Sequence, residues 1–171
     1  MKLAAITYVH GQGEAVDQLL RELAEDLKAS GLKLGGAIQW NRPSQSHSRC
    51  DMELEDLASG QRINASDKAR AANSCRLDAW ALEDAAGLVA ASIAPGVDFV
   101  IVNRFGKQEA SGQGFRATIE AAIANDLPVL TSLNVAHQAA FDAFTGGEAG
   151  LLAADREAVR AWCRSALAQD N

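Results

Sequence analysis

Residues 3–27 have the sequence LAAITYVHGQGEAVDQLLRELAEDL and set the architecture of the chain. Its first part, Leu3 to Val9, is apolar and β-branched and predicts a strand. A glycine-bearing turn follows at residues 10–13, and apolar residues then recur with helical spacing from Val16 to Leu27. Gly31 stands where a helix C-cap is expected, and residues 32–39 have the pattern of a second strand. The first forty residues therefore predict a βαβ unit with parallel pairing and a right-handed crossover.

The remaining sequence continues the alternation of strands and helices. Residues 97–102 are apolar and predict a buried central strand, a glycine-bearing loop is expected at 104–114, and Asp78 is the expected N-cap of the preceding helix. Residues 50–65 predict a β-hairpin about Ser59-Gly60, which interrupts the alternation. Further elements are expected as helices at 115–123, 135–144 and 155–168, a strand at 128–133 and an edge strand at 149–153. We expect one domain over residues 1–171, a three-layer α/β sandwich with a mainly parallel sheet and a β-hairpin insertion.

Composition limits the classes of function. The chain has 171 residues, 48% of them hydrophobic, which is enough for a core without metal or disulfide support. A net charge of −6 argues against nucleic-acid binding, which needs a basic face. The chain has an odd number of cysteines without CxxC spacing, and its start, MKLAAITYV, lacks the pattern of a signal peptide. These features predict a protein of the cytoplasm, with its cysteines reduced. No apolar run approaches the roughly 20 residues that span a bilayer, so no membrane insertion is expected.

Three loops are expected to meet at one edge of the sheet. In open parallel sheets, ligands bind beyond the carboxyl ends of the strands, where residues 10–14, 103–112 and 131–134 would gather. Gly11 and Gly13 would bring unpaired backbone N–H groups and the positive end of a helix dipole close to an anion. The alternative interpretation of these glycines is a tight turn without a ligand.

A resemblance to a known family rests on several short motifs. Residues 96–109, GVDFVIVNRFGKQE, resemble the second nucleotide-binding segment of the THEP-type nucleoside-triphosphatases, where an apolar strand runs into Asp-Glu-Ile-Gly-Lys-Met-Glu. With RCDM at 49–52, CRLD at 75–78 and GQGF at 112–115, nearly the whole chain is similar to an uncharacterised bacterial family related to those enzymes. Members of that family are often encoded near molybdate-uptake genes. The resemblance implies a P-loop-like fold and a molybdenum-pathway protein as partner.

The chain departs from the active enzymes at the residues that handle phosphate and magnesium. GxxxxGK[ST] supplies a lysine and a magnesium-binding hydroxyl, whereas HGQGEAV at residues 10–16 supplies neither. Asn103 stands where a magnesium-holding Asp is expected, and Arg104 replaces an acidic residue. These degenerate motifs disfavour ATP hydrolysis and predict an anion pocket that uses no metal. Phosphate and molybdate cannot be distinguished from the residues, and the molybdate idea comes from the resemblance alone.

The predicted anion site combines backbone groups with cations. The alternative is that the arginine and lysine side chains of these loops are solvated, as loop cations usually are. Asp51, Asp78 or Glu109 could also neutralise their charge in place of an anion. Cys50 and Cys75 each adjoin an arginine, so they are candidates for ligand contact, redox chemistry or a disulfide, with a buried free cysteine as the common alternative. The predicted anion-binding residues are Gly11, Gly13, Arg49, Arg76, Asn103, Arg104 and Lys107.

The leading hypothesis is a non-hydrolysing protein that binds an oxyanion or a nucleotide phosphate, in molybdenum handling or its regulation. An alternative is an active nucleoside-triphosphatase that binds magnesium and a nucleotide. In that case Lys107 would bind the phosphate, and Glu109 or Asp78 would orient water or the metal. A third is a protein-interaction module with a vestigial site. The expected partner is a small anionic ligand, and a homo-oligomer is a further candidate assembly.

Overall fold

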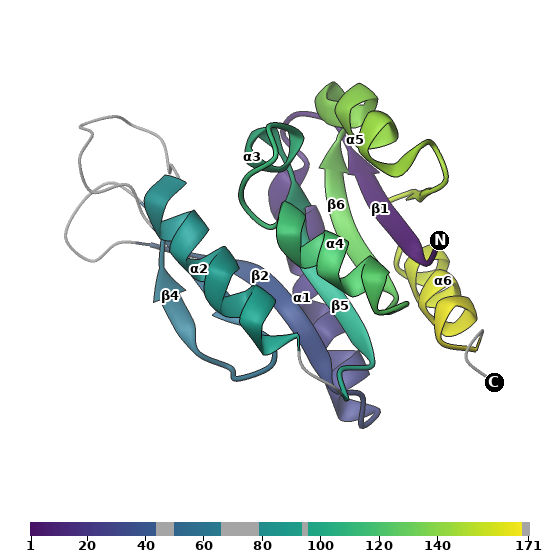
Figure 1. Cartoon of the computed structure of the whole chain (residues 1–171), viewed down its shortest axis with the longest axis horizontal. Coiled ribbons are helices and arrows are strands. Elements are labelled where there is room, and N and C mark those ends of the chain that lie inside the picture. The colour runs from purple at the N-terminus through teal and green to yellow at the C-terminus, as the bar shows by residue number, and fades with distance from the viewer. Residues whose placement is uncertain (44–49, 66–78, 94–95, 169–171) are drawn as a thin grey trace.

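The computed structural model describes residues 1–43, 50–65, 79–93 and 96–168. It contains a single seven-stranded sheet with helices on both faces (Figure 1). The strands are β1 Leu3–Tyr8, β2 Leu34–Pro43, β3 Cys50–Asp56, β4 Arg62–Asn64, β5 Phe99–Phe105, β6 Val129–Asn134 and β7 Gly150–Leu152. The helices are α1 Gly13–Ala29, α2 Ala79–Ser92, α3 Lys107–Ala110, α4 Arg116–Ala124, α5 Gln138–Thr145 and α6 Arg156–Ala168, and the 3₁₀ turn η1, Val135–His137, precedes α5.

The strand order is β4-β3-β2-β5-β6-β1-β7. The five strands from β2 to β7 in this order pair in parallel, whereas β3 and β4 pair antiparallel. The predicted α/β class with a mainly parallel sheet is therefore confirmed, and a P-loop NTPase-like architecture is consistent with it. The β3–β4 hairpin lies at one edge of the sheet, where short antiparallel strands can be added without a crossover helix.

The expected pairing of the first two strands is wrong. β1 and β2 run in the same direction, but β5 and β6 lie between them. Leu3 of β1 pairs with Val129 of β6, and Leu34 of β2 pairs with Phe99 of β5. β5 and β6 are buried along nearly their whole length, as is expected of strands in the middle of a sheet that is covered on both faces.

Two predicted boundaries also change. The loop expected from residue 104 begins later, because β5 continues through Arg104 to Phe105 and α3 then begins at Lys107. β2 continues to Pro43, which is in register with Cys50, so β2, β3 and β4 form an antiparallel meander. The predicted N-cap residue Asp78 lies outside the described residues.

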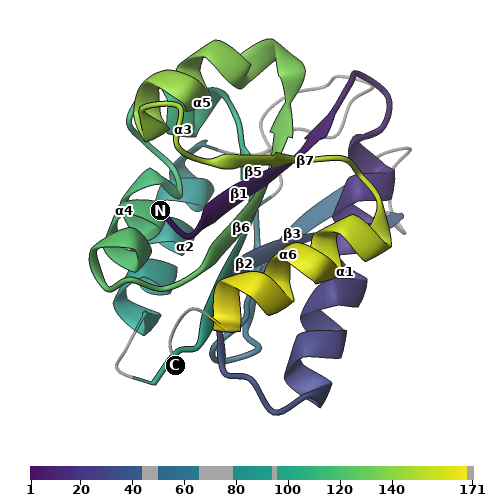
Figure 2. The same cartoon turned by 90° about the vertical axis from the view of Figure 1, so that its right-hand side faces the viewer.

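The helices form the two outer layers of a sandwich. Figure 2 shows α1 and α6 side by side on one face of the sheet, with α2 and α4 on the other. Each face has its own buried cluster: Ile6, Leu20 and Ile101 belong to the cluster under α1 and α6, whereas Val102, Phe105 and Ile119 belong to the one under α2 and α4. Alternating side chains of β5 enter both clusters, so this strand fixes the two layers relative to each other.

In the part of the chain that the structure describes, no helix is both long enough and apolar enough to cross a membrane.

Candidate functional site

The candidate site lies where β1 and β5 end and α1 begins. The turn after β1 is tight, because the Gln12 N–H donates to the Val9 carbonyl at 3.1 Å and the Gln12 side chain accepts from the Val9 N–H at 3.2 Å. Gly11 has a φ of +88°, which this turn requires and which a side chain would strain. The turn is therefore held by its own hydrogen bonds between Val9 and Gln12. The backbone N–H groups of this segment that are available to an anion are those that follow Gln12.

The first turn of α1 carries free donors. The first bond of the helix joins the Val16 N–H to the Gln12 carbonyl at 3.2 Å, and Gln12 provides no side-chain cap. Among the described residues, no partner accepts from the N–H groups of Gly13, Glu14 and Ala15. These groups lie at the positive end of a 17-residue helix. The exposed carboxylate of Glu14 in the same turn works against an anion there.

A β-bulge in β5 orients the two residues that replace the expected acidic pair. Val102 is in register with Thr131 of β6, and Phe105 with Leu133. Between these two pairs β5 advances by three residues and β6 by two, so β5 contains one extra residue. Val102 and Phe105 consequently point into the same core cluster. The extra residue turns both Asn103 and Arg104 toward α1, since bulges re-aim side chains that strict alternation would separate.

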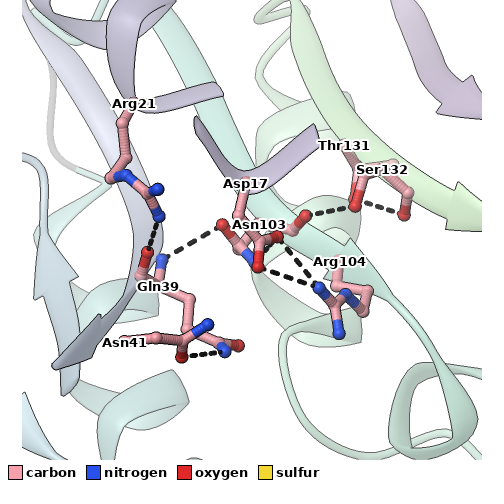
Figure 3. A network of polar contacts seen from close by, with 8 residues as sticks. All are labelled: Asp17, Arg21, Gln39, Asn41, Asn103, Arg104, Thr131 and Ser132. Carbon is pink, nitrogen blue, oxygen red and sulfur yellow. Dashed lines mark hydrogen bonds and ion pairs between the residues drawn. The ribbon is translucent and has the colours of Figure 1, made fainter. Parts of the chain in front are cut away.

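Asn103 is buried, with 3% of its surface exposed, and its polar atoms are engaged. Its Oδ1 accepts from the Gln39 N–H at 3.1 Å, and its Nδ2 donates to Asp17 Oδ1 at 3.0 Å. Its carbonyl accepts from Ser132 Oγ at 2.6 Å. Figure 3 shows Asn103 at the centre of this network, which joins β2, β5, β6 and α1. The side chain therefore holds the strand ends together.

Arg104 forms a forked ion pair with Asp17. Its Nη2 lies 2.9 Å from Asp17 Oδ1 and 3.1 Å from Oδ2, and the aspartate side chain is 2% exposed. The guanidinium also lies over the ring of Tyr8, 5.6 Å from its centre. The pKa of Tyr8 is raised, chiefly by burial, while Arg104 opposes the shift. Asp17 neutralises much of the Arg104 charge, although 37% of the arginine side chain stays exposed.

The two predicted anion-binding segments meet. A Cβ placed on Gly13 would lie 3.4 Å from Arg104 Nη2 and 3.5 Å from the Tyr8 ring. Glycine at this position therefore allows the start of α1 to approach the guanidinium without a side chain between them. Arg104 Nε is buried and, among the described residues, has no hydrogen-bond partner.

Lys107 lies beside a cavity on the other face of the sheet. It is exposed at the start of α3, and the cavity has a volume of about 320 Å³. Of the predicted anion-binding residues that the structure describes, Asn103, Arg104 and Lys107 line this cavity, whereas Gly11 and Gly13 do not. The lining residues are Gln39, Met52, Leu54, Leu82, Asn103, Arg104, Gly106, Lys107, Gln108, Glu109 and Phe115.

Glu109 braces the loop that follows β5. Its side chain is buried, Oε2 accepts from the Gly106 N–H at 2.9 Å, and Oε1 accepts from the Phe115 N–H at 3.0 Å. The Gly114 N–H in the same loop donates to Glu83 of α2. Burial raises the pKa of Glu109, with a smaller contribution from Glu83, while the backbone donors oppose the shift. This carboxylate supports the loop and is poorly placed to orient water or metal.

Several predicted residues lie outside the described residues. They are Arg49, Arg76, Cys75 and Asp78; Cys50 and Asp51 are placed as residues of β3, but their side chains are not described. Their predicted roles stay predictions. In the described ranges, no three His, Cys, Asp or Glu side chains gather as metal ligands.

The sequence reasoning overlooked Asp17. It lies one turn after Gly13 on the face of α1 that also carries Val16, Leu20 and Ala24, all buried. An acidic residue on the apolar face of an amphipathic helix is the signal that could have revealed it, because a buried charge needs a partner. The partner itself could not be read from the chain, since Arg104 is 87 positions away.

Comparison with known proteins adds a family and one long relative. Residues 3–162 match the family model described as "Protein of unknown function (DUF2478)". The chain is also 37% identical over 164 residues to the protein named "Molybdenum import ATP-binding protein ModC 2" of Bradyrhizobium diazoefficiens, strain USDA 110. That match covers 95% of this chain but 18% of the relative, so the chain is similar to a small part of a much longer protein. No solved structure is significantly similar to it.

Proposed function

The chain belongs to the DUF2478 family, and we propose that it is a non-hydrolysing anion-binding protein of molybdenum handling. The observation that carries the proposal is the approach of Gly13 to the Arg104 guanidinium, 3.4 Å from the position of a Cβ, beside the free amides of α1. Backbone N–H groups and a guanidinium are the donors that recognise oxyanions in proteins.

The same geometry argues against a magnesium-dependent triphosphatase. A P-loop enzyme needs a lysine and a hydroxyl at the start of this helix, and the chain has Glu14 and Ala15 there instead. Asn103 replaces a carboxylate and is committed to Asp17 and Gln39. The buried acid nearest to this position in the structure, Asp17, is paired with Arg104. These residues support binding of a compact anion better than they support hydrolysis of a nucleotide.

The link to molybdenum rests on the relative and on its name. That protein is described as a molybdenum import ATP-binding protein, and this chain is similar to 18% of it. Because this chain has no GxxxxGK[ST] motif, its similarity supports a shared role in molybdenum handling more than a shared ATPase activity. We propose molybdate as the ligand and a molybdenum-import ATPase as the partner.

Calorimetric titration tests the proposed activity. We expect molybdate to bind without magnesium, and we expect no phosphate release from ATP with or without it. The Gly13→Ala variant should bind molybdate roughly tenfold more weakly, because the added carbon would lie 3.4 Å from Arg104 Nη2, between the guanidinium and the free amides. Gly87→Ala, the same change within α2 with nothing within 4 Å of the added carbon, is the matched control and should bind as the natural protein does.

Two results would contradict the proposal. The first is magnesium-dependent phosphate release from ATP that survives further purification, since that would make the chain a triphosphatase. The second is the absence of heat with molybdate, tungstate, phosphate and sulfate alike, which would favour an interaction module.

A further inference from the structure

The cavity beside Lys107 is larger than an inorganic oxyanion requires. Its volume of about 320 Å³ is many times the roughly 10–15 Å³ that suffices for one water molecule. A central atom with its oxygens would fill a small part of this space. The volume falls at the lower end of the range, about 300–1,000 Å³, that is typical of sites for organic ligands.

The floor of the cavity is apolar. Leu54 of β3, Leu82 of α2 and Phe115 are each no more than 4% exposed and belong to the core cluster under α2 and α4. Met52, 8% exposed, adds a flexible thioether from the same face of β3. Such a surface gains free energy by covering itself with a ring or another apolar group, and it offers nothing to a hydrated ion.

The rim is polar and carries cations. Arg104 and Lys107 line it from the end of β5 and the start of α3, and Gln39 lines it from β2. Figure 3 shows Gln39 and Arg104 on opposite sides of Asn103. Among the described residues that line the cavity, Glu109 is the one acid, and it is buried and accepts from two backbone amides. Anionic groups are therefore favoured at the rim, and apolar groups at the floor.

We infer that this cavity binds an organic anion, in which an aromatic or heteroaromatic ring occupies the floor and a phosphate or carboxylate faces Arg104 and Lys107. This inference rests on the proposed function and refines it, since it names the class of ligand, an aromatic organic anion, that would bind in the cavity beside Lys107. The cavity lies on the α2 face of the sheet, whereas the free amides of α1 lie at the start of a helix on the opposite face. Arg104 borders both locations, so they are tested separately through Met52 and Lys107 on the cavity side and through Gly13 on the α1 side.

A series of matched probes distinguishes the ring from the anionic group. Naphthyl phosphate, naphthol, inorganic phosphate and molybdate would be titrated into the natural protein by calorimetry. We expect naphthyl phosphate to bind roughly tenfold or more tightly than either naphthol or phosphate, because each of these lacks one half of the interaction. In nuclear magnetic resonance spectra, naphthyl phosphate should shift the amide signals of Leu82 and Gly106 and leave those of Gly11 and Glu14 in place.

Two variants separate the floor from the rim. Met52→Trp should place a larger side chain in the cavity and weaken naphthyl phosphate roughly tenfold, while molybdate binding is unchanged. Lys107→Gln should weaken naphthyl phosphate but not naphthol. An unchanged melting temperature of each variant would show that it folds. If a variant does not fold, the amide shifts of Leu82 and Gly106 in the natural protein still show whether naphthyl phosphate binds in the cavity.

Each outcome has one meaning. If phosphate or naphthol binds as tightly as naphthyl phosphate, the inference fails, and molybdate binding would still support the proposed function. If naphthyl phosphate binds at Leu82 and Gly106 but molybdate does not bind, the proposed function fails and the inference stands. If no probe binds, both fail.

Discussion

At the scale of single residues, the candidate site depends on the pair formed by Asp17 and Arg104. A buried carboxylate in water-free surroundings is costly unless it is paired, and Asp17 has its charge balanced by one guanidinium. The pair also determines how much positive charge is available to a ligand. The Nη2 group of Arg104 is used by Asp17, so the remaining part of the guanidinium and Lys107 are the groups that we propose attract an anion.

Removing Arg104 should therefore destabilise the fold. We expect Arg104→Gln to lower the free energy of unfolding by about 2 kcal/mol, less than for a fully buried pair because the arginine is partly exposed. The double variant Asp17→Asn with Arg104→Gln should recover at least half of that loss, since no unpaired charge stays buried. Urea unfolding of the single and double variants measures both values.

An exposed ion pair provides the control. Arg156 pairs with Glu22 at the surface, and Arg156→Gln should change the unfolding free energy by less than about 0.5 kcal/mol. If Arg104→Gln is as mild as Arg156→Gln, the Asp17 pair does not have the role in stability that its burial indicates.

At the scale of elements, the contact between β2 and β5 leaves no room for a side chain at Gly36. Gly36 of β2 has a φ of +94°, and a Cβ at this position would lie 2.0 Å from the carbonyl oxygen of Ile101. Only glycine fits this position. The contact places the ends of β2 and β5 side by side, and thereby places the Gln39 N–H within reach of Asn103.

The Gly36→Ala substitution should consequently damage the sheet. We expect a loss of about 3 kcal/mol or more in unfolding free energy, because the added methyl group meets backbone that cannot move without breaking the β2–β5 pairing. Gly87→Ala is the matched control, since Gly87 lies within α2 with nothing within 4 Å of the added carbon. That change should stabilise the protein by about 0.5–1 kcal/mol. Equal effects of the two substitutions, measured by thermal unfolding, would contradict the close contact.

At the scale of the whole molecule, buried charge gives stability a dependence on pH. Burial raises the pKa of Glu109 above its ordinary value. Between the pKa of the unfolded chain and the raised pKa of the folded protein, the folded state binds more protons at this position. The contribution of Glu109 to stability is therefore complete below the ordinary value and is lost as the pH rises through the raised one.

Comparison with Glu109→Gln isolates this effect. The unfolding free energy of the natural protein should fall relative to that of the variant as the pH rises from about 4.5, the ordinary range of a glutamate, toward neutrality. Urea unfolding of both proteins across that range gives the difference directly. The variant keeps the size of the side chain and one oxygen acceptor for the Gly106 or Phe115 N–H. Parallel pH profiles for the two proteins would show that Glu109 ionises in the folded state as it does in the unfolded chain.

Much of the fold could be predicted because its signals are local. Apolar runs with β-branched residues located β1, β5 and β6, helical spacing located α1 and α4, and the Ser59-Gly60 turn located the β3–β4 hairpin. Each of these signals depends on residues that are close together in the chain. The α/β class follows from their alternation, since strands that alternate with helices pack as a parallel sheet between two helical layers.

The candidate site could be predicted only in part. The expectation that the segments around Gly13 and Arg104 meet follows from a general property of parallel sheets, whose carboxyl ends share one edge. Whether Asn103 faces a ligand or the interior could not be predicted, because strict alternation along β5 would send Asn103 and Arg104 to opposite faces. The bulge between Val102 and Phe105 changed that outcome, and it arises from the register with β6.

The amino-acid sequence by itself determined most elements of this protein, their alternation, and the presence of Glu14 and Ala15 in place of a lysine and a hydroxyl after Gly13. Only the tertiary structure decided the strand order, the bulge in β5, the pairing of Asp17 with Arg104 and the cavity beside Lys107. The physical reason is the range of the interactions. Backbone preference and periodicity act over a few neighbouring residues, whereas strand order, buried charge pairs and cavities depend on which distant segments pack together.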